Sequence, residues 1–205
     1  MKIGLIGAGK LGNKVIEELK IRNLESTIFE KNEENFDNCD VIIDCTTTGF
    51  NERAHKINKP IVIATTQEIR AYPQNVPILI IPNSSSWVLL HSFLVTLAKY
   101  QKYHFIINDF HSENKKDAPA GSARKLIAAL EETGATTQTL CVRKFDIKGE
   151  YSITAFNENE TIKIEHKVND RAVYAHGLVE AAIWLSKQKS GIYTSEEFFE
   201  QFTKN

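Results

Sequence analysis

Residues 2–12 read KIGLIGAGKLG, an apolar run that leads into three closely spaced glycines and the start of a helical pattern. Gly7, Gly9 and Gly12 have the spacing G-x-G-x-x-G, directly after a strand-like run. In such a loop the first glycine permits the tight turn, the second lets a pyrophosphate approach the backbone, and the third lets the helix pack on the strand. Because a helix N-terminus offers free N–H groups to phosphates, the stretch predicts a unit that binds a dinucleotide.

The apolar runs that follow predict a parallel sheet. A helix is expected over residues 10–20, because Leu11, Val15 and Leu19 share one face. Further short apolar runs that read as strands lie at 26–29, 40–46, 60–65 and 77–81. Strands that alternate with helical or connecting segments are typical of a doubly wound α/β fold. We therefore predict a Rossmann-type dinucleotide-binding domain from residues 1–84 and 177–205.

A different pattern begins after residue 84. Helices are expected at 87–100, 122–132 and 178–187, and strands at 104–110, 138–145, 151–156 and 161–168. In the last two strands apolar and polar residues alternate, which suits an antiparallel sheet with one face in water. We predict a second, α+β domain over residues 85–176, with an antiparallel or mixed sheet.

Composition excludes several classes of protein. The chain has 205 residues, of which 42% are hydrophobic, so it has the means to build a core. Lys and Arg number 25 against 26 Asp and Glu, which gives no support to nucleic-acid binding. No apolar run approaches the ~18–20 residues of a membrane span, and the N-terminus does not read as a signal peptide. Three cysteines without CxxC spacing predict neither disulfides nor a metal site, and we expect a cytoplasmic protein.

The expected cofactor is NADH or NADPH. Glu30 follows Gly12 at close to the ~20-residue spacing of the acidic residue that holds the adenosine ribose. A carboxylate there favours NADH, because it would repel a 2′-phosphate. Lys10 and Lys31 are interpreted either as ammonium groups that neutralise that phosphate or as surface lysines without a role, and we expect the use of both cofactors.

A polar loop carries the candidate chemistry of the second domain. Residues 111–123 read HSENKKDAPAGSA and lead into the predicted helix. His111 can exchange a proton near neutral pH, and the ammonium of Lys115 suits a carboxylate. Ser122 is a suitable N-cap, and Gly121 can bring its N–H close to an anion. The loop is therefore interpreted either as an anion site with a nearby acid or as a solvated charged loop.

The same loop resembles a family signature. Residues 109–123, DFHSENKKDAPAGSA, are similar to the run E-x-H-H-x-x-K-x-D-A-P-S-G-T-A of the dihydrodipicolinate reductase family. Further segments that resemble the family, in the same order, are 39–46, 64–67, 81–85, 166–177 and 191–193. The resemblance covers nearly the whole chain, and the loop is its most specific part.

This resemblance implies an enzyme that reduces a cyclic imine dicarboxylate in the diaminopimelate and lysine pathway. His111 is expected to be the acid, Lys115 to lie near a substrate carboxylate as a second possible proton donor, and Ser112, Gly121 and Ser122 to bind the substrate. Residues expected to bind the cofactor are Gly7, Gly9, Lys10, Leu11, Gly12, Glu30, Lys31, Thr46, Ala64, Thr65, Thr66, Pro82 and Asn83. The family also implies a homotetramer assembled through the substrate domain, with a small dicarboxylate as partner.

Several positions depart from the family pattern. Ser112 replaces the second histidine of the signature, Ala120 a serine, Gln67 a glycine and His176 an asparagine. The chain is also short for the family, with the missing part expected after Lys31 and in loops of the second domain. Two alternatives stay open: a related aspartate or diaminopimelate dehydrogenase, and a dinucleotide-binding sensor that has lost turnover.

Overall fold

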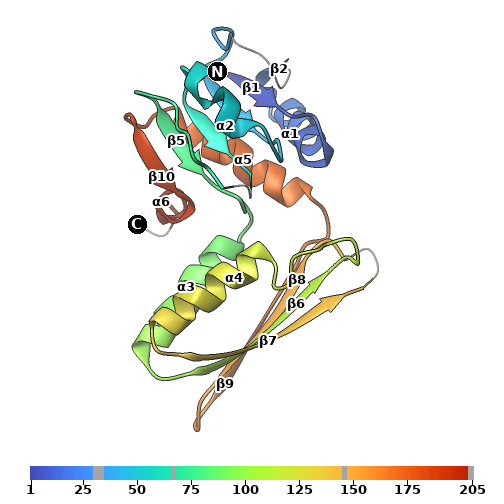
Figure 1. The fold of residues 1–205 in the computed structure, drawn as a ribbon, viewed down its shortest axis with the longest axis vertical. Helices are drawn as coiled ribbons and strands as arrows, with labels where there is room; N and C mark the ends of the chain where they lie inside the picture. The colour runs from blue at the N-terminus through green and yellow to red at the C-terminus, as the bar shows by residue number, and fades with distance from the viewer. Residues whose placement is uncertain (30–34, 66–67, 145–146, 203–205) are drawn as a thin grey trace. The chain divides into compact units, whose positions relative to one another are not determined.

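The computed structural model describes residues 1–29, 35–65, 68–144 and 147–202 (Figure 1). The chain divides into two compact units. The first comprises Met1–Val88 together with the residues from Arg171 onward, and the second comprises Leu89–Asp170. Each unit is described by itself.

The first unit is built on a six-stranded, all-parallel sheet in the order β10-β5-β4-β3-β1-β2. Its strands are β1 (Lys2–Ile6), β2 (Glu25–Phe29), β3 (Val41–Asp44), β4 (Ile61–Ile63), β5 (Pro77–Ile80) and β10 (Gly191–Thr194). Strand order reverses beside β1, which has β2 on one side and β3 on the other. The predicted Rossmann-type fold is confirmed.

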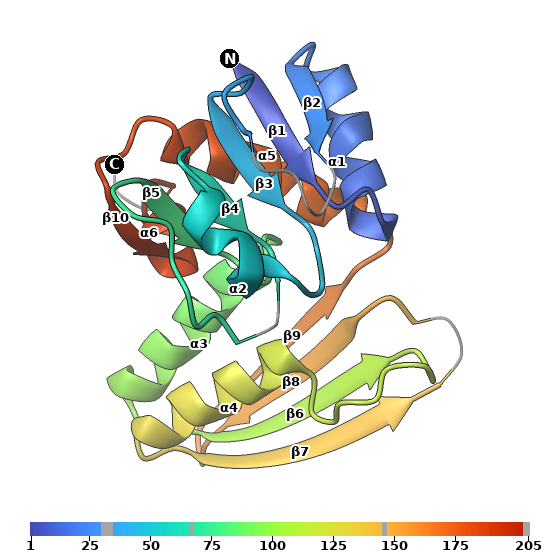
Figure 2. The ribbon, with the colours of Figure 1, turned by 45° about the horizontal axis from the view of Figure 1, so that its top comes forward.

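Helices pack against both faces of this sheet. The helices of the first unit are α1 (Lys10–Ile21), α2 (Phe50–Arg53), the 3-10 helix η1 (Ala54–Lys56), α5 (Ala172–Leu185) and α6 (Ser195–Glu200). Helix α5 packs on α1 and on β3, β4 and β5 (Figure 2). Phe50 and Ala54 join one core cluster with Ile6 and Ile42, so α2 and η1 contribute to the core of the sheet. Alternate strand residues therefore enter separate apolar layers, as expected of strands buried on both faces.

Helix α5 begins at Ala172, six residues before the predicted start at 178. This start places Gly177 inside the helix, where glycine is weakening. A Cβ at this position would lie 1.9 Å from the backbone oxygen of Ser84. The glycine is thus explained by close packing of the helix on the chain after β5. Strand β10 was not predicted, since its side chains are mostly exposed and form no apolar run.

The second unit contains a four-stranded sheet in the order β7-β6-β8-β9. Its elements are β6 (His104–His111), α4 (Gly121–Glu132), β7 (Thr136–Arg143), β8 (Glu150–Phe156) and β9 (Thr161–Lys167), and helix α3 (Trp87–Tyr100) begins at the unit boundary. Strands β6 and β7 are parallel and the other pairs antiparallel, so the sheet is mixed. The parallel pair follows from α4, because a helical crossover returns the chain in the same direction.

One residue of β6 on the inward face of this sheet is a buried acid. Along β6, Phe105 and Ile107 are buried and lie opposite Ala155 and Ile153 of β8. The next inward position is Asp109, which is 0% exposed. Figure 2 shows α4 lying over this sheet. A charged side chain therefore stands where the pattern of the strand calls for an apolar one.

None of the helices in the described ranges combines the length and apolar character that a membrane span needs.

Candidate functional site

The glycine loop after β1 has the geometry of a phosphate site. Gly7 has φ of +90°, in the left-handed region that favours glycine. A Cβ on Gly12 would lie 2.0 Å from the backbone oxygen of Gly7, so the helix packs directly on the turn. Around Gly9, by contrast, a Cβ would meet no heavy atom of the described residues within 4 Å. The loop is thus closed at Gly12 and open at Gly9.

The N-terminus of α1 adds charge to this opening. Gly9 is the N-cap, so no side chain bonds the first N–H groups from that position, and the first turn carries no acidic residue. Lys10 is exposed and Leu11 half-buried. A helix N-terminus whose N-cap has no side chain to bond the first N–H groups, with a lysine beside it, attracts an anion. These residues therefore fit the pyrophosphate of a dinucleotide.

A buried ion pair shapes the next loop, after β3. Asp44 accepts hydrogen bonds from the Thr46 N–H at 2.8 Å and the Thr46 hydroxyl at 2.6 Å. Its other oxygen accepts from Arg53 Nη2 at 2.9 Å, and both side chains are 5% exposed or less. Arg53 also donates to the Gly49 carbonyl at 2.7 Å. The Thr46 hydroxyl is therefore engaged inside the loop, and the sequence reading had missed the roles of Asp44 and Arg53.

The remaining predicted cofactor residues follow neighbouring strands. Ala64 and Thr65 follow β4, and the Ala64 N–H donates to the Asp44 carbonyl at 3.0 Å. Pro82 and Asn83 follow β5, where the Asn83 side chain accepts from the Ser85 N–H at 3.0 Å. With the glycine loop they occupy the carboxyl edge of adjacent parallel strands, where open α/β sheets bind ligands.

Glu30, Lys31 and Thr66 lie outside the described residues, so their predicted role in cofactor binding stays a prediction.

In the second unit, Asp109 organises the signature loop. One carboxylate oxygen lies 2.6 Å from His111 Nδ1. The other accepts from the Ala120 N–H at 2.7 Å and from Arg143 Nη2 at 2.9 Å. Burial alone would raise the pKa of Asp109, but these hydrogen bonds outweigh it and lower the pKa to about 2. Asp109 is therefore an ionised carboxylate that joins both ends of the loop.

Arg143 completes this network from β7. It lies beside His111 in the parallel register of β6 and β7. Its guanidinium donates to the Asp109 carbonyl at 3.0 Å and to the Asp117 carbonyl at 2.7 Å. The middle of the loop is thereby tied to the sheet. Sequence reading had not singled out Asp109 or Arg143 as site residues, although an acid at an inward position of a strand was a usable signal.

The predicted acid sits next to an aromatic ring. The His111 side chain is 13% exposed, and its ring meets that of Tyr151 edge-on, with centroids 5.6 Å apart. The ring of Tyr151 stacks in turn on that of His166 at 6.4 Å. Burial lowers the pKa of His166. Packing and the bond to Asp109 together hold the His111 ring in one orientation.

The loop after His111 brings the other predicted residues toward the start of α4. The carbonyl of Ser112 accepts from the Lys115 N–H at 3.0 Å, which closes a turn. The Lys115 ammonium lies 2.7 Å from Asp117, and both side chains are about one-third exposed. Partial burial would raise the pKa of Asp117, but the hydrogen bond from Lys115 lowers it. Lys115 is thus a cation at the surface of the loop.

The start of α4 corrects one expectation. The helix begins at Gly121 with Ala120 as its N-cap, so Ser122 is inside the first turn and is not the N-cap. The N–H of Ala120 already donates to the buried Asp109, which fixes the helix start at this residue. Gly121 and Ser122 are both half-buried at this N-terminus.

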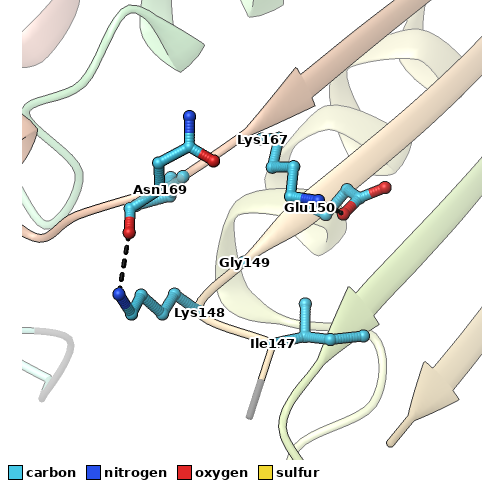
Figure 3. Close-up of a pocket in the computed structure, with 7 residues that line it drawn as sticks. Ile147, Lys148, Gly149, Glu150, Lys167 and Asn169 are labelled. Carbon is cyan, nitrogen blue, oxygen red and sulfur yellow. Dashed lines mark hydrogen bonds and ion pairs between the residues drawn. The ribbon is translucent and has the colours of Figure 1, made fainter. Parts of the chain in front are cut away.

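A separate pocket of about 230 Å³ opens at the same end of the sheet, lined by residues 147–150 and 167–169. Figure 3 shows Lys148 reaching the backbone oxygen of Asn169, 2.7 Å away, and Lys167 beside Glu150. Both lysines are thus engaged within the pocket wall.

Within residues 1–29, 35–65, 68–144 and 147–202, no three His, Cys, Asp or Glu side chains are grouped to hold a metal ion.

Comparison with known proteins places the chain in a family. The model of "Dihydrodipicolinate reductase, C-terminus" matches residues 87–199. The 4-hydroxy-tetrahydrodipicolinate reductase of Campylobacter curvus is 31% identical, over 95% of this chain and 97% of that protein. That of Campylobacter jejuni is 28% identical, over 97% of this chain and 98% of that protein, in an alignment of 238 positions. Since this chain has 205 residues, that relative carries segments that it lacks.

A solved structure shares the fold of this chain. The solved dihydrodipicolinate reductase of Paenisporosarcina sp. TG-14, with dipicolinate bound, has a TM-score of 0.72 at 16% identity, over 96% of this chain and 98% of that one. At that identity the likeness shows the fold, while the family model and the sequence relatives carry the assignment. The chain therefore belongs to the dihydrodipicolinate reductase family.

Proposed function

We propose that this oxidoreductase reduces 4-hydroxy-tetrahydrodipicolinate (dihydrodipicolinate) to tetrahydrodipicolinate with NADH or NADPH, in diaminopimelate and lysine biosynthesis. Curated relatives that cover nearly the whole chain are named for this reaction. The observation that carries the proposal is the buried Asp109 bound to His111 at the start of a loop that ends at the N-terminus of α4. This arrangement offers an acid and an anion site within one loop.

The substrate is a dianion, and the loop offers two ways to bind a carboxylate. The N-terminus of α4 presents backbone N–H groups of Gly121 and Ser122 together with its partial positive charge. Lys115 offers a mobile ammonium, and a substrate carboxylate would compete with Asp117 for it. We assign one substrate carboxylate to the helix and Lys115 together, with Ser112 as a hydrogen-bonding neighbour.

The reduction needs a hydride and a proton. A bound nicotinamide dinucleotide supplies the hydride. We assign the proton to His111, whose ring is fixed by Asp109 and Tyr151. On this assignment the negative charge that builds on the substrate is quenched within the site.

The first unit is proposed to hold the dinucleotide, and the second the substrate. The pyrophosphate is assigned to Gly7, Gly9, Lys10, Leu11 and Gly12, because the loop is open at Gly9 and faces an uncovered helix N-terminus. We propose the use of both NADH and NADPH. A ratio of kcat/KM values above about 100-fold between the two cofactors would contradict this, since it corresponds to roughly 2.7 kcal/mol of discrimination.

A homotetramer and a cytoplasmic location are proposed on the family resemblance. The outward side of β7 carries an exposed Leu140, 58% accessible, which a sheet-to-sheet contact would cover. Light scattering tests the tetramer, and a monomer over the working concentration range would contradict it.

The function is tested by steady-state oxidation of NADH with freshly generated imine substrate. The wild-type protein is expected to turn over. His111→Gln and Lys115→Ala are each expected to lower kcat by about 100-fold, while the dissociation constant for NADH stays unchanged. Full turnover by either variant would remove that residue from the chemistry.

A further inference from the structure

We propose that Asp109 is a positioning residue that holds His111 with a proton on Nδ1, so that Nε2 is the nitrogen that gives its proton to the substrate. Arg143 keeps the Asp109 carboxylate ionised and oriented for this role. The inference rests on the proposed function, since it names how the acid of that reaction is prepared. In the step, His111 starts as the imidazolium, with a proton on each ring nitrogen. The N–H bond at Nε2 breaks as the new bond between that proton and the substrate forms, and a neutral imidazole protonated on Nδ1 and bonded to Asp109 remains.

The hydrogen-bond pattern around Asp109 determines where the proton lies. Oδ2 already accepts from two donors, the Ala120 N–H and Arg143 Nη2. Oδ1 lies 2.6 Å from His111 Nδ1, a distance that requires a hydrogen between the two atoms. The carboxylate is buried against a guanidinium and its pKa is about 2, so it is an acceptor without a proton of its own. The hydrogen therefore belongs to Nδ1.

Further groups constrain the ring. Tyr151 of β8 presses its ring edge-on against His111, and His166 of β9 stacks behind Tyr151. Arg143 comes from β7 on the other side of β6 and binds the carbonyl of Asp109 as well as its carboxylate. Residues of the strands on both sides of β6 thus hold the Asp109 and His111 side chains in place. Rotation of the imidazole would break its bond to Asp109.

A single substitution separates this role from a purely structural one. In Asp109→Asn, the donors Ala120 and Arg143 select the amide orientation that leaves oxygen at the Oδ2 position. The amide NH2 then stands where Oδ1 was and faces His111 Nδ1. Because two donors cannot bond each other, the proton of neutral His111 has to move to Nε2. The variant therefore keeps the volume and the loop contacts of Asp109 and inverts the bond to His111.

The experiment combines kinetics with imidazole NMR. Asp109→Asn is expected to lower kcat by about 100-fold, with the KM for NADH changed by less than about twofold. In a double-mutant cycle, Asp109→Asn is expected to lower the residual kcat of His111→Gln by less than about threefold. In ¹⁵N spectra of the neutral ring, the His111 proton is expected on Nδ1 in wild type and on Nε2 in Asp109→Asn. Asp109→Glu keeps the negative charge, and its kcat is expected to be at least about tenfold higher than that of Asp109→Asn.

Three results would overturn the inference. These are turnover of Asp109→Asn within about threefold of wild type, an equal loss of kcat in the wild-type and His111→Gln backgrounds, and an unchanged His111 tautomer. If Asp109→Glu fails to fold, the double-mutant cycle and the spectra still decide the matter. If wild type itself does not reduce the imine, the proposed function is wrong, while the spectra still test the tautomer.

Discussion

Gly9→Ala separates cofactor binding from folding. Gly9 has φ of −78° in extended backbone, which an alanine adopts without strain. An added Cβ meets no heavy atom within 4 Å in the part of the chain that the structure describes. The loss of glycine flexibility in the unfolded chain stabilises the protein by about 0.4–1 kcal/mol. The weaker N-cap preference of alanine offsets this. The free energy of unfolding is therefore expected to change by less than about 1 kcal/mol.

Binding is expected to respond differently. We propose that a pyrophosphate approaches the backbone in the open space over Gly9, and a methyl group there would hold the phosphates away from the N-terminus of α1. The affinity for NADH should fall at least about tenfold, which corresponds to ~1.4 kcal/mol. Fluorescence titration with NADH and urea unfolding, both on the same preparation, measure the two effects.

Gly12→Ala is the matched control. Its Cβ would lie 2.0 Å from the Gly7 oxygen, so the helix has to shift, at a cost of about 1–3 kcal/mol in stability. Gly12→Ala should thus lose stability and binding together, whereas Gly9→Ala loses binding alone. If Gly9→Ala folds normally and binds NADH as tightly as wild type, the glycine loop is not the phosphate site.

The remaining predictions concern buried charge. Arg53→Met leaves Asp44 buried without the partner of its ion pair. The free energy of unfolding, measured by urea titration, should fall by about 3–5 kcal/mol. A fall of less than about 1 kcal/mol would show that the fold does not need the pair. Asp109 has its pKa lowered from 3.8 to about 2, so its ionised form stabilises the folded state above pH ~4, and this contribution of roughly 2 kcal/mol is lost as the pH falls toward 2. The difference in urea stability between wild type and Asp109→Asn should accordingly shrink between pH 6 and pH 3, and a constant difference would contradict the assignment.

Much of the fold could be predicted because local patterns and tertiary structure agree. The glycine loop specified the first strand, turn and helix, and Trp87–Tyr100 is a helix over the predicted residues. Predictions failed where packing overrides a local preference. Gly177 lies inside α5 because the helix packs there on the backbone of Ser84, where a Cβ would not fit. No local sequence pattern reveals this contact. Strand β10 is held by pairing to β5 and has no apolar run of its own.

The candidate site was partly accessible from sequence. His111 and Lys115 were singled out by residue type and by a family signature. The structure places His111 at the end of β6 and Lys115 on the loop that leads from this strand to α4. The partners that prepare them come from elsewhere in the chain. Arg143 reaches Asp109 across 34 positions because β6 and β7 are adjacent in the sheet. Ser122 was misplaced as the N-cap because the bond from Ala120 to Asp109 fixes where the helix begins.

The most direct test of the central claim is the fate of the hydride. The protein is incubated with freshly generated imine substrate and with NADH in which both hydrogens on C4 of the nicotinamide are replaced by deuterium. The product is examined by mass spectrometry. The expected product is tetrahydrodipicolinate with one deuterium in place of one hydrogen, formed in step with the oxidation of NADH. Tight binding of NADH with no labelled product would contradict it, and would favour a dinucleotide-binding sensor.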